Sequence, residues 1–102
     1  MTDRELLELA AIACGELRGE WVGNDAYFDG VLTRWSPLTD DGDALRLAVK
    51  LLFEIDMGRG CIAIRHSTGI KILEAFNHDP YAAIRRAIVR AAAEIGRQHE
   101  HQ

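Results

Sequence analysis

The hydrophobic pattern of residues 35–52 predicts the element around which the rest of the chain is organised. A short polar turn leads into residues 43–53, where apolar side chains take almost every direction around a helical axis. Asp43, Arg46 and Lys50 share the one narrow polar strip. A helix that is apolar on nearly all sides is typically buried, so we expect this helix at the centre of the core.

A second helix is predicted at the start of the chain. Thr2 and Glu5 have the spacing of a capping box, in which each side chain satisfies a backbone amide of the other. The apolar positions that follow recur at helical spacing on one face. We expect this helix to end at residues 17–18, because Gly19 can adopt the left-handed conformation that terminates helices.

A third helix is predicted near the end of the chain. It begins at Asp79 and Pro80, which are favourable N-cap and first-turn residues. Residues 97–102 are expected to form a flexible tail. The predicted buried stripe of this helix comprises Tyr81, Ile84, Ile88, Ala91, Ala92 and Ile95.

The remaining segments have the pattern of strands. Residues 20–35 hold β-prone fragments separated by glycine and Asn-Asp, which predicts either an irregular hairpin or a short strand with a long loop. Residues 53–57 alternate between apolar and polar, residues 58–59 suit a two-residue hairpin turn, and strands follow at 61–66 and 70–76. Because apolar residues occur at both parities, we expect helices to cover both faces of this antiparallel meander.

These elements predict an α+β fold, specifically a three-layer α/β/α sandwich with a mainly antiparallel sheet and a central buried helix. Residues 1–102 suffice for a single domain with its own core. The net charge of −4 disfavours nucleic acid as a partner. The chain has neither a basic leader followed by an apolar run nor an apolar segment of about 20 residues, which disfavours a membrane location.

The residues that commonly hold metals do not form a known ligand pattern. Cys14 and Cys61 lie on predicted core faces, which favours buried thiols over a disulfide. Asp40, Asp41 and Asp43 lack the distal glutamate of a calcium loop, and their position favours helix capping, for which Thr39 is also suitable. We therefore expect no metal and no cofactor.

Two stretches carry a resemblance to a known family. They are WSPLTDDGDALRLAVKL at residues 35–51 and NHDPYAAIRRAIVRAAAEIGR at residues 77–97, with ELLELA at residues 5–10 in addition. Together they resemble the phage ABA-sandwich proteins, which are small proteins encoded by tailed bacteriophages and prophages; residues 21–35 and 53–76 match only in pattern. The resemblance implies a phage or prophage origin and a layered α/β/α fold, and it transfers no site residues.

Aromatic residues are denser between positions 21 and 35 than elsewhere. One interpretation is that these rings close the end of a small core. The other is that they form a recognition surface, since exposed aromatic side chains anchor interfaces. The residues concerned are Trp21, Tyr27, Phe28 and Trp35.

Arginines supply the second group of candidate binding residues. Arg65 lies in a predicted strand of a covered sheet, where it either reaches solvent past an edge or binds an anion. Arg86, Arg90 and Arg97 lie on one face of the last helix. That face is either simply solvated or contacts an anionic partner.

The sequence spacing places no nucleophile, base and orienting group together, so we expect a protein that is not an enzyme. The first hypothesis is a cytoplasmic phage accessory protein that binds a host protein or defence system through the aromatic segment. One alternative is a protein that sequesters an anionic nucleotide, with Arg65 at the floor of an aromatic pocket. A structural or assembly-associated phage protein is the other, and homodimerisation through a sheet edge stays open.

Overall fold

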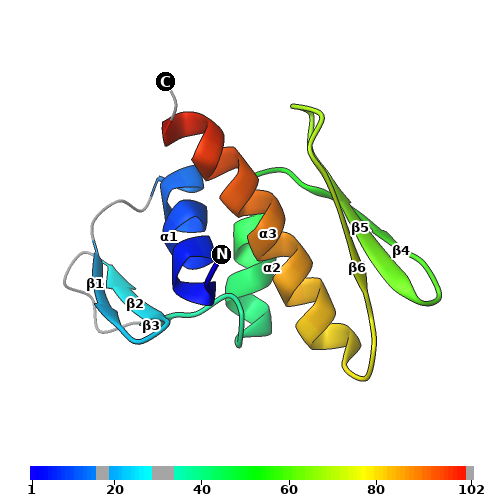
Figure 1. Cartoon of the computed structure of the whole chain (residues 1–102), viewed down its shortest axis with the longest axis horizontal. Coiled ribbons are helices and arrows are strands. Elements are labelled where there is room, and N and C mark those ends of the chain that lie inside the picture. Colours follow the sequence, from blue (N-terminus) through cyan, green and yellow to red (C-terminus); the bar gives the residue numbers. More distant parts are fainter. Residues whose placement is uncertain (16–18, 29–33, 101–102) are drawn as a thin grey trace.

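The computed structural model describes residues 1–15, 19–28 and 34–100, and its elements follow one another in the predicted order (Figure 1). Three helices and two three-stranded antiparallel sheets make up this part of the chain, which confirms the predicted α+β class. The elements are α1 (Asp3–Ala13), β1 (Gly19–Val22), β2 (Asp25–Phe28), β3 (Arg34–Trp35), α2 (Asp41–Lys50), β4 (Glu54–Met57), β5 (Cys61–Arg65), β6 (Lys71–Ala75) and α3 (Pro80–Glu100).

The helices form the middle of the molecule, with one sheet on each side (Figure 1). Sheet β1–β3 lies beside α1, and sheet β4–β6 lies beside α3. Helix α3 packs against α1, α2, β5 and β6, and therefore occupies the centre. The prediction placed the sheet between helices and α2 at the centre, whereas in the structure the helices lie between the two sheets and α3 is central.

Helix α1 starts with the predicted capping box. The Glu5 amide donates to Thr2 Oγ1 at 3.2 Å, and the Thr2 amide donates to Glu5 Oε1 at 3.4 Å. The helix ends at Ala13, and the predicted end at residues 17–18 is wrong. Gly15 already has a φ of +84°, so the left-handed residue that terminates the helix comes earlier than expected.

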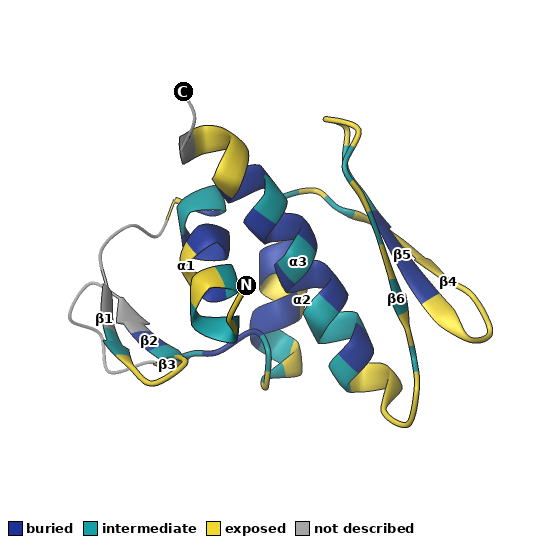
Figure 2. Ribbon diagram, in the orientation of Figure 1, coloured by how far each residue is buried: buried dark blue, intermediate teal, exposed yellow. Residues whose placement is uncertain are grey.

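Helix α2 is buried on one side only. Ala44, Leu47 and Ala48 belong to the core, whereas Leu45 is 58% exposed and Val49 is 64% exposed (Figure 2). The prediction that this helix is buried on nearly all sides is wrong. Sheet β4–β6 covers α3 and leaves one side of α2 without a neighbour in the described part of the chain.

Sheet β4–β6 forms the predicted meander, with a different first turn. Met57 lies opposite Ile62, and the Gly58 amide donates to the Cys61 carbonyl at 2.9 Å, so residues 59–60 make the turn. The predicted turn at residues 58–59 is one residue too early. The observed register places Met57 and Ile55 opposite the two isoleucines of β5, which matches apolar side chains on one face.

Only one face of sheet β4–β6 is covered by helices. Ile62 and Ile64 of β5 are fully buried in the core. The other face carries charged and exposed side chains, so the prediction of helices on both faces is wrong. These outer residues include Glu54, Asp56, Arg65, Lys71 and Leu73.

Helix α3 begins as predicted and extends further. Asp79 Oδ1 accepts from the Ala82 amide at 3.1 Å, and the helix continues through residues 97–100, where a tail was expected. Tyr81 is exposed although it was assigned to the buried stripe. In the ranges that the structure describes, no helix is both long and apolar enough to cross a membrane.

Candidate functional site

The two tryptophans of the predicted recognition segment anchor the smaller sheet. Trp21 and Trp35 pack edge to face with ring centroids 6.4 Å apart, and both are partly buried against the core. The Arg4 guanidinium lies 4.5 Å from the Trp21 ring centre and donates to the Gly23 carbonyl at 3.1 Å. These contacts fix sheet β1–β3 to α1. The side chains of Tyr27 and Phe28 lie outside the described residues.

The predicted arginines lie in ion pairs. Arg65 lies on the outer face of sheet β4–β6, with Nη1 at 3.3 Å from Asp56 and 3.7 Å from Glu54. Arg86 contacts Asp3 at 3.1 Å. Arg90 of α3 bridges to Glu74, and Arg97 to Glu94. Each positive charge is therefore compensated by a carboxylate within the chain.

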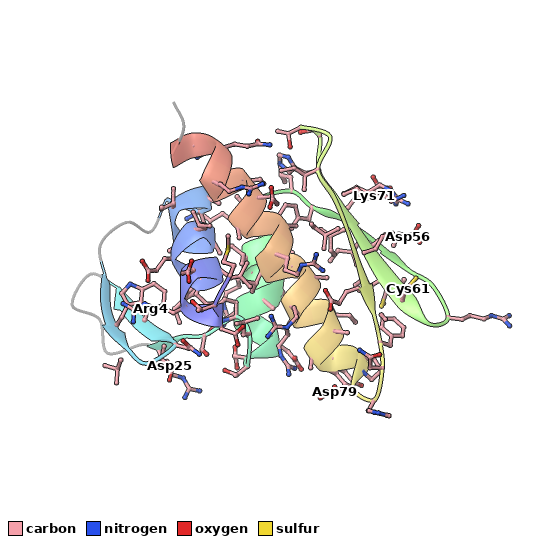
Figure 3. All side chains as sticks on the ribbon, viewed as in Figure 1. Arg4, Asp25, Asp56, Cys61, Lys71 and Asp79 are labelled. Atoms are coloured by element: carbon pink, nitrogen blue, oxygen red, sulfur yellow. The ribbon has the colours of Figure 1, made fainter. Side chains whose placement is uncertain are left out.

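The structure does not bring the predicted aromatic and arginine residues into one site. Arg4, which stacks on Trp21, and Asp56, which pairs with Arg65, lie at opposite sides of the helices (Figure 3). Trp21 and Arg65 therefore belong to different sheets with the helical layer between them. Among the described side chains, the predicted tryptophans therefore form no pocket with Arg65.

A groove that the sequence did not predict lies between α2, β4 and the start of α3. Its volume is about 320 Å³. Four large apolar side chains that line it reach solvent, among them Met57 at 64% and Tyr81 at 67% exposure. The lining residues are Asp41, Ala44, Leu45, Ile55, Met57, Tyr81, Ile84, Arg85 and Ile88. Four of the nine large apolar side chains that are exposed in the described part of the chain therefore line this one groove.

The polar turn before α2 fixes one wall of the groove. Asp40 caps the helix by accepting from the Asp43 amide at 2.8 Å. Asp43 is itself buried, accepting from the Ser36 amide at 2.9 Å and from Arg46 Nη2 at 2.7 Å. This hydrogen bond to Asp43 is the main reason that the pKa of Arg46 is raised. Asp40 thus serves the predicted capping role, whereas Asp43 ties the preceding turn to α2.

An ion pair marks the polar rim of the groove. Arg85 Nη1 lies 2.6 Å from Asp41 Oδ1, and Arg85 Nε donates to the Leu38 carbonyl at 2.8 Å. Beyond the groove, Val49 of α2 and Leu52, which follows the end of this helix, are also exposed. The result is an apolar centre with a charged edge, which is the anatomy of protein interfaces.

The apolar residues that line this groove were visible in the sequence, but their pattern was interpreted as evidence that they are buried. Helix α2 has two apolar faces: one packs in the core, and the other, which holds Leu45 and Val49, is exposed. The alternation of residues 53–57 likewise gave Ile55 and Met57 one common face. Which of these faces would remain open depended on packing between distant elements.

A second concavity, of about 390 Å³, lies where β6 leads into α3. Its lining includes two carboxylates, Glu74 and Asp79, together with His78. Arg86, which also lines it, is paired with Asp3. The balance of charge therefore does not favour an anionic ligand there.

The cysteines and the acidic residues do not gather into a metal centre in the described residues. No group of three or more His, Cys, Asp or Glu side chains there is placed to hold a metal ion. Cys14 is buried as predicted, whereas Cys61 is exposed, so the prediction of a buried Cys61 is wrong. Neither cysteine forms a disulfide.

Comparison of the chain with protein-family models, with curated proteins and with solved structures gave no match. The resemblance of residues 35–51 and 77–97 to the phage ABA-sandwich family stays a prediction.

Proposed function

We propose that this protein is a non-enzymatic binding protein whose protein partner docks in the groove between α2, β4 and α3. The observation that carries the proposal is the exposure of Leu45, Met57 and Tyr81 around one concavity. Single exposed apolar residues are common on protein surfaces, but a cluster of them at one place marks an interaction site.

The residue types in the groove suit protein recognition. Tyrosine and methionine are enriched at the centres of interfaces, because both present a large apolar surface. The methionine side chain can also adapt to different partners. The Asp41–Arg85 pair at the rim keeps charge away from the centre, which lowers the cost of excluding water there.

The partner that we propose is a host protein or a component of a host defence system in the bacterial cytoplasm. This part of the proposal is supported by the resemblance to the phage ABA-sandwich family. An assembly-associated phage protein would use the same groove for a phage partner. Sequestration of an anionic nucleotide has less support, because the candidate arginines are already paired with carboxylates.

The test compares two leucine variants in affinity capture from a bacterial host lysate. Leu45 and Leu73 are both 58% exposed, but Leu73 lies on the outer face of sheet β4–β6, away from the groove. We expect the wild type and Leu73→Ser to retain a stoichiometric protein partner that Leu45→Ser loses. Circular dichroism checks that both variants are folded. Equal recovery of the partner by both variants would contradict the proposed site.

A further inference from the structure

We infer that the groove receives an extended segment of the partner, which adds to the open edge of β4 as a new strand and alternates apolar with basic residues. This inference rests on the proposed function, because it names the mode of binding and the chemistry of the proposed protein partner. It is carried by the hydrogen-bonding register of β4, by the direction of its side chains and by its charge.

The register shows which backbone groups of β4 are open. In the described sheet the strand order is β4-β5-β6, so β4 is an edge strand. The bond from the Gly58 amide to Cys61 marks a hydrogen-bonded pair, and such pairs alternate along an antiparallel ladder. The amides and carbonyls of Ile55 and Met57 therefore point toward the open edge, whereas those of Asp56 point toward β5.

The same two residues line the groove. The side chains of Ile55 and Met57 form its β4 wall, and Leu45 of α2 lies on the other wall. A strand that bonds to the backbone of Ile55 and Met57 would place every second side chain on this side of the sheet. Its apolar residues would therefore lie over the groove and cover Leu45. Strand addition of this kind obtains affinity from the backbone and specificity from alternate side chains.

The other face of β4 selects for positive charge. Glu54 and Asp56 are both exposed there, and they share a single arginine, Arg65. Lys71 of β6 lies opposite Arg65, so the positive charges of this face lie on β5 and β6, and the negative charges lie on β4, beside the open edge. Opposite charges on neighbouring strands stabilise a sheet, so lysine or arginine is favoured at the alternate positions of the added strand.

A second copy of the chain is a poorer occupant of this edge. Pairing β4 with β4 of another copy in a continuous sheet would place Glu54 and Asp56 beside their own counterparts. Like charges directly opposite one another destabilise strand pairing. The acidic edge thus acts against self-association while it leaves the edge open to a basic segment.

The experiment measures amide hydrogen exchange by NMR in the full-length protein with a synthetic peptide. The probe is a capped peptide of alternating valine and lysine, about eight residues long, and the matched probe alternates valine and glutamate. At a lysine-peptide concentration about ten times Kd, exchange at Ile55 and Met57 should slow about tenfold. The Asp56 amide, which already donates within the sheet, should change little.

Charge variants test the selection for basic residues. Asp56→Lys should weaken binding of the lysine peptide by about two- to tenfold, because an attraction between strands becomes a repulsion. Glu8→Lys makes the same change of charge on α1, where Glu8 pairs with Arg4, and should leave binding unchanged. Equal binding of the lysine and glutamate peptides would overturn the charge argument.

The outcomes separate this inference from the proposed function. If Leu45→Ser abolishes capture of a partner but no peptide protects Ile55 and Met57, the groove is an interface and strand addition is wrong. Protection of both amides by the lysine peptide supports strand addition even when no partner is captured. Protection that grows with protein concentration in the absence of peptide would identify a second copy as the occupant and overturn the inference.

Discussion

Helices α1 and α3 pack backbone against backbone at Gly96 of α3, and replacing this glycine with alanine should destabilise the fold. A Cβ atom at this position would lie 2.7 Å from the carbonyl carbon of Leu9 and 3.2 Å from its Cα, and closer still to the carbonyl oxygen. Ordinary contacts begin at 3.4 Å. The obstacle is the backbone of α1, which cannot rotate away, so the two helices must separate by more than an ångström.

The magnitude follows from two opposing effects. Overpacking of a core typically costs about 1–3 kcal/mol, and a backbone obstacle places Gly96→Ala at or above the upper end. The better helix propensity of alanine offsets about 1 kcal/mol of this loss in the free energy of unfolding. We expect a net loss of about 2 kcal/mol in the free energy of unfolding. For a domain of this size, that loss lowers Tm by about 10 °C.

The assay is urea and thermal unfolding followed by circular dichroism. Gly60→Ala is the matched control, because a Cβ there meets nothing within 4 Å and the residue has no positive φ. The control should stay within about 0.5 kcal/mol of the wild type. A Gly96→Ala protein as stable as the control would contradict this prediction, because it would show that the backbones of α1 and α3 are not in close contact at Gly96.

Other predictions concern the turn before α2 and the two thiols. Asp43→Ala should lower the free energy of unfolding by about 1–3 kcal/mol, because the buried Ser36 amide loses its acceptor. Asp40→Ala should cost about 1 kcal/mol through loss of the N-cap; urea unfolding measures both, and unchanged midpoints would contradict them. In the folded protein iodoacetamide should label the exposed Cys61 and leave the buried Cys14 unmodified until urea unfolds the chain, as mass spectrometry would show. Equal labelling of the two thiols before unfolding would contradict the assigned burial.

The local elements of the fold could be predicted from the amino-acid sequence, because short-range interactions form them. The capping box of Thr2 and Glu5, the Asp40 cap and the Asp79 cap each lie within three residues of the amide they bind, so their spacing was sufficient. The alternation that predicted β4 depends on a period of two, which belongs to the strand itself. The α+β class followed from the order of these elements.

Two features depend on tertiary packing and could not be predicted from the sequence. They are the extent to which α2 is buried and the set of residues that line the candidate site. The periodicity of α2 shows which apolar side chains share a face of the helix. Whether Leu45 is covered depends on where sheet β4–β6 packs against α3. Leu45, Met57 and Tyr81 meet at one groove because three elements pack side by side, and no local pattern encodes that meeting. The predicted binding residues included Trp21 and Arg65, because tryptophan and arginine are common in binding sites. In the structure these two residues lie in separate sheets, where Trp21 stacks on Arg4 and Arg65 pairs with Asp56. Burial and grooves arise from contacts between distant segments, and the chain's local pattern does not specify those contacts.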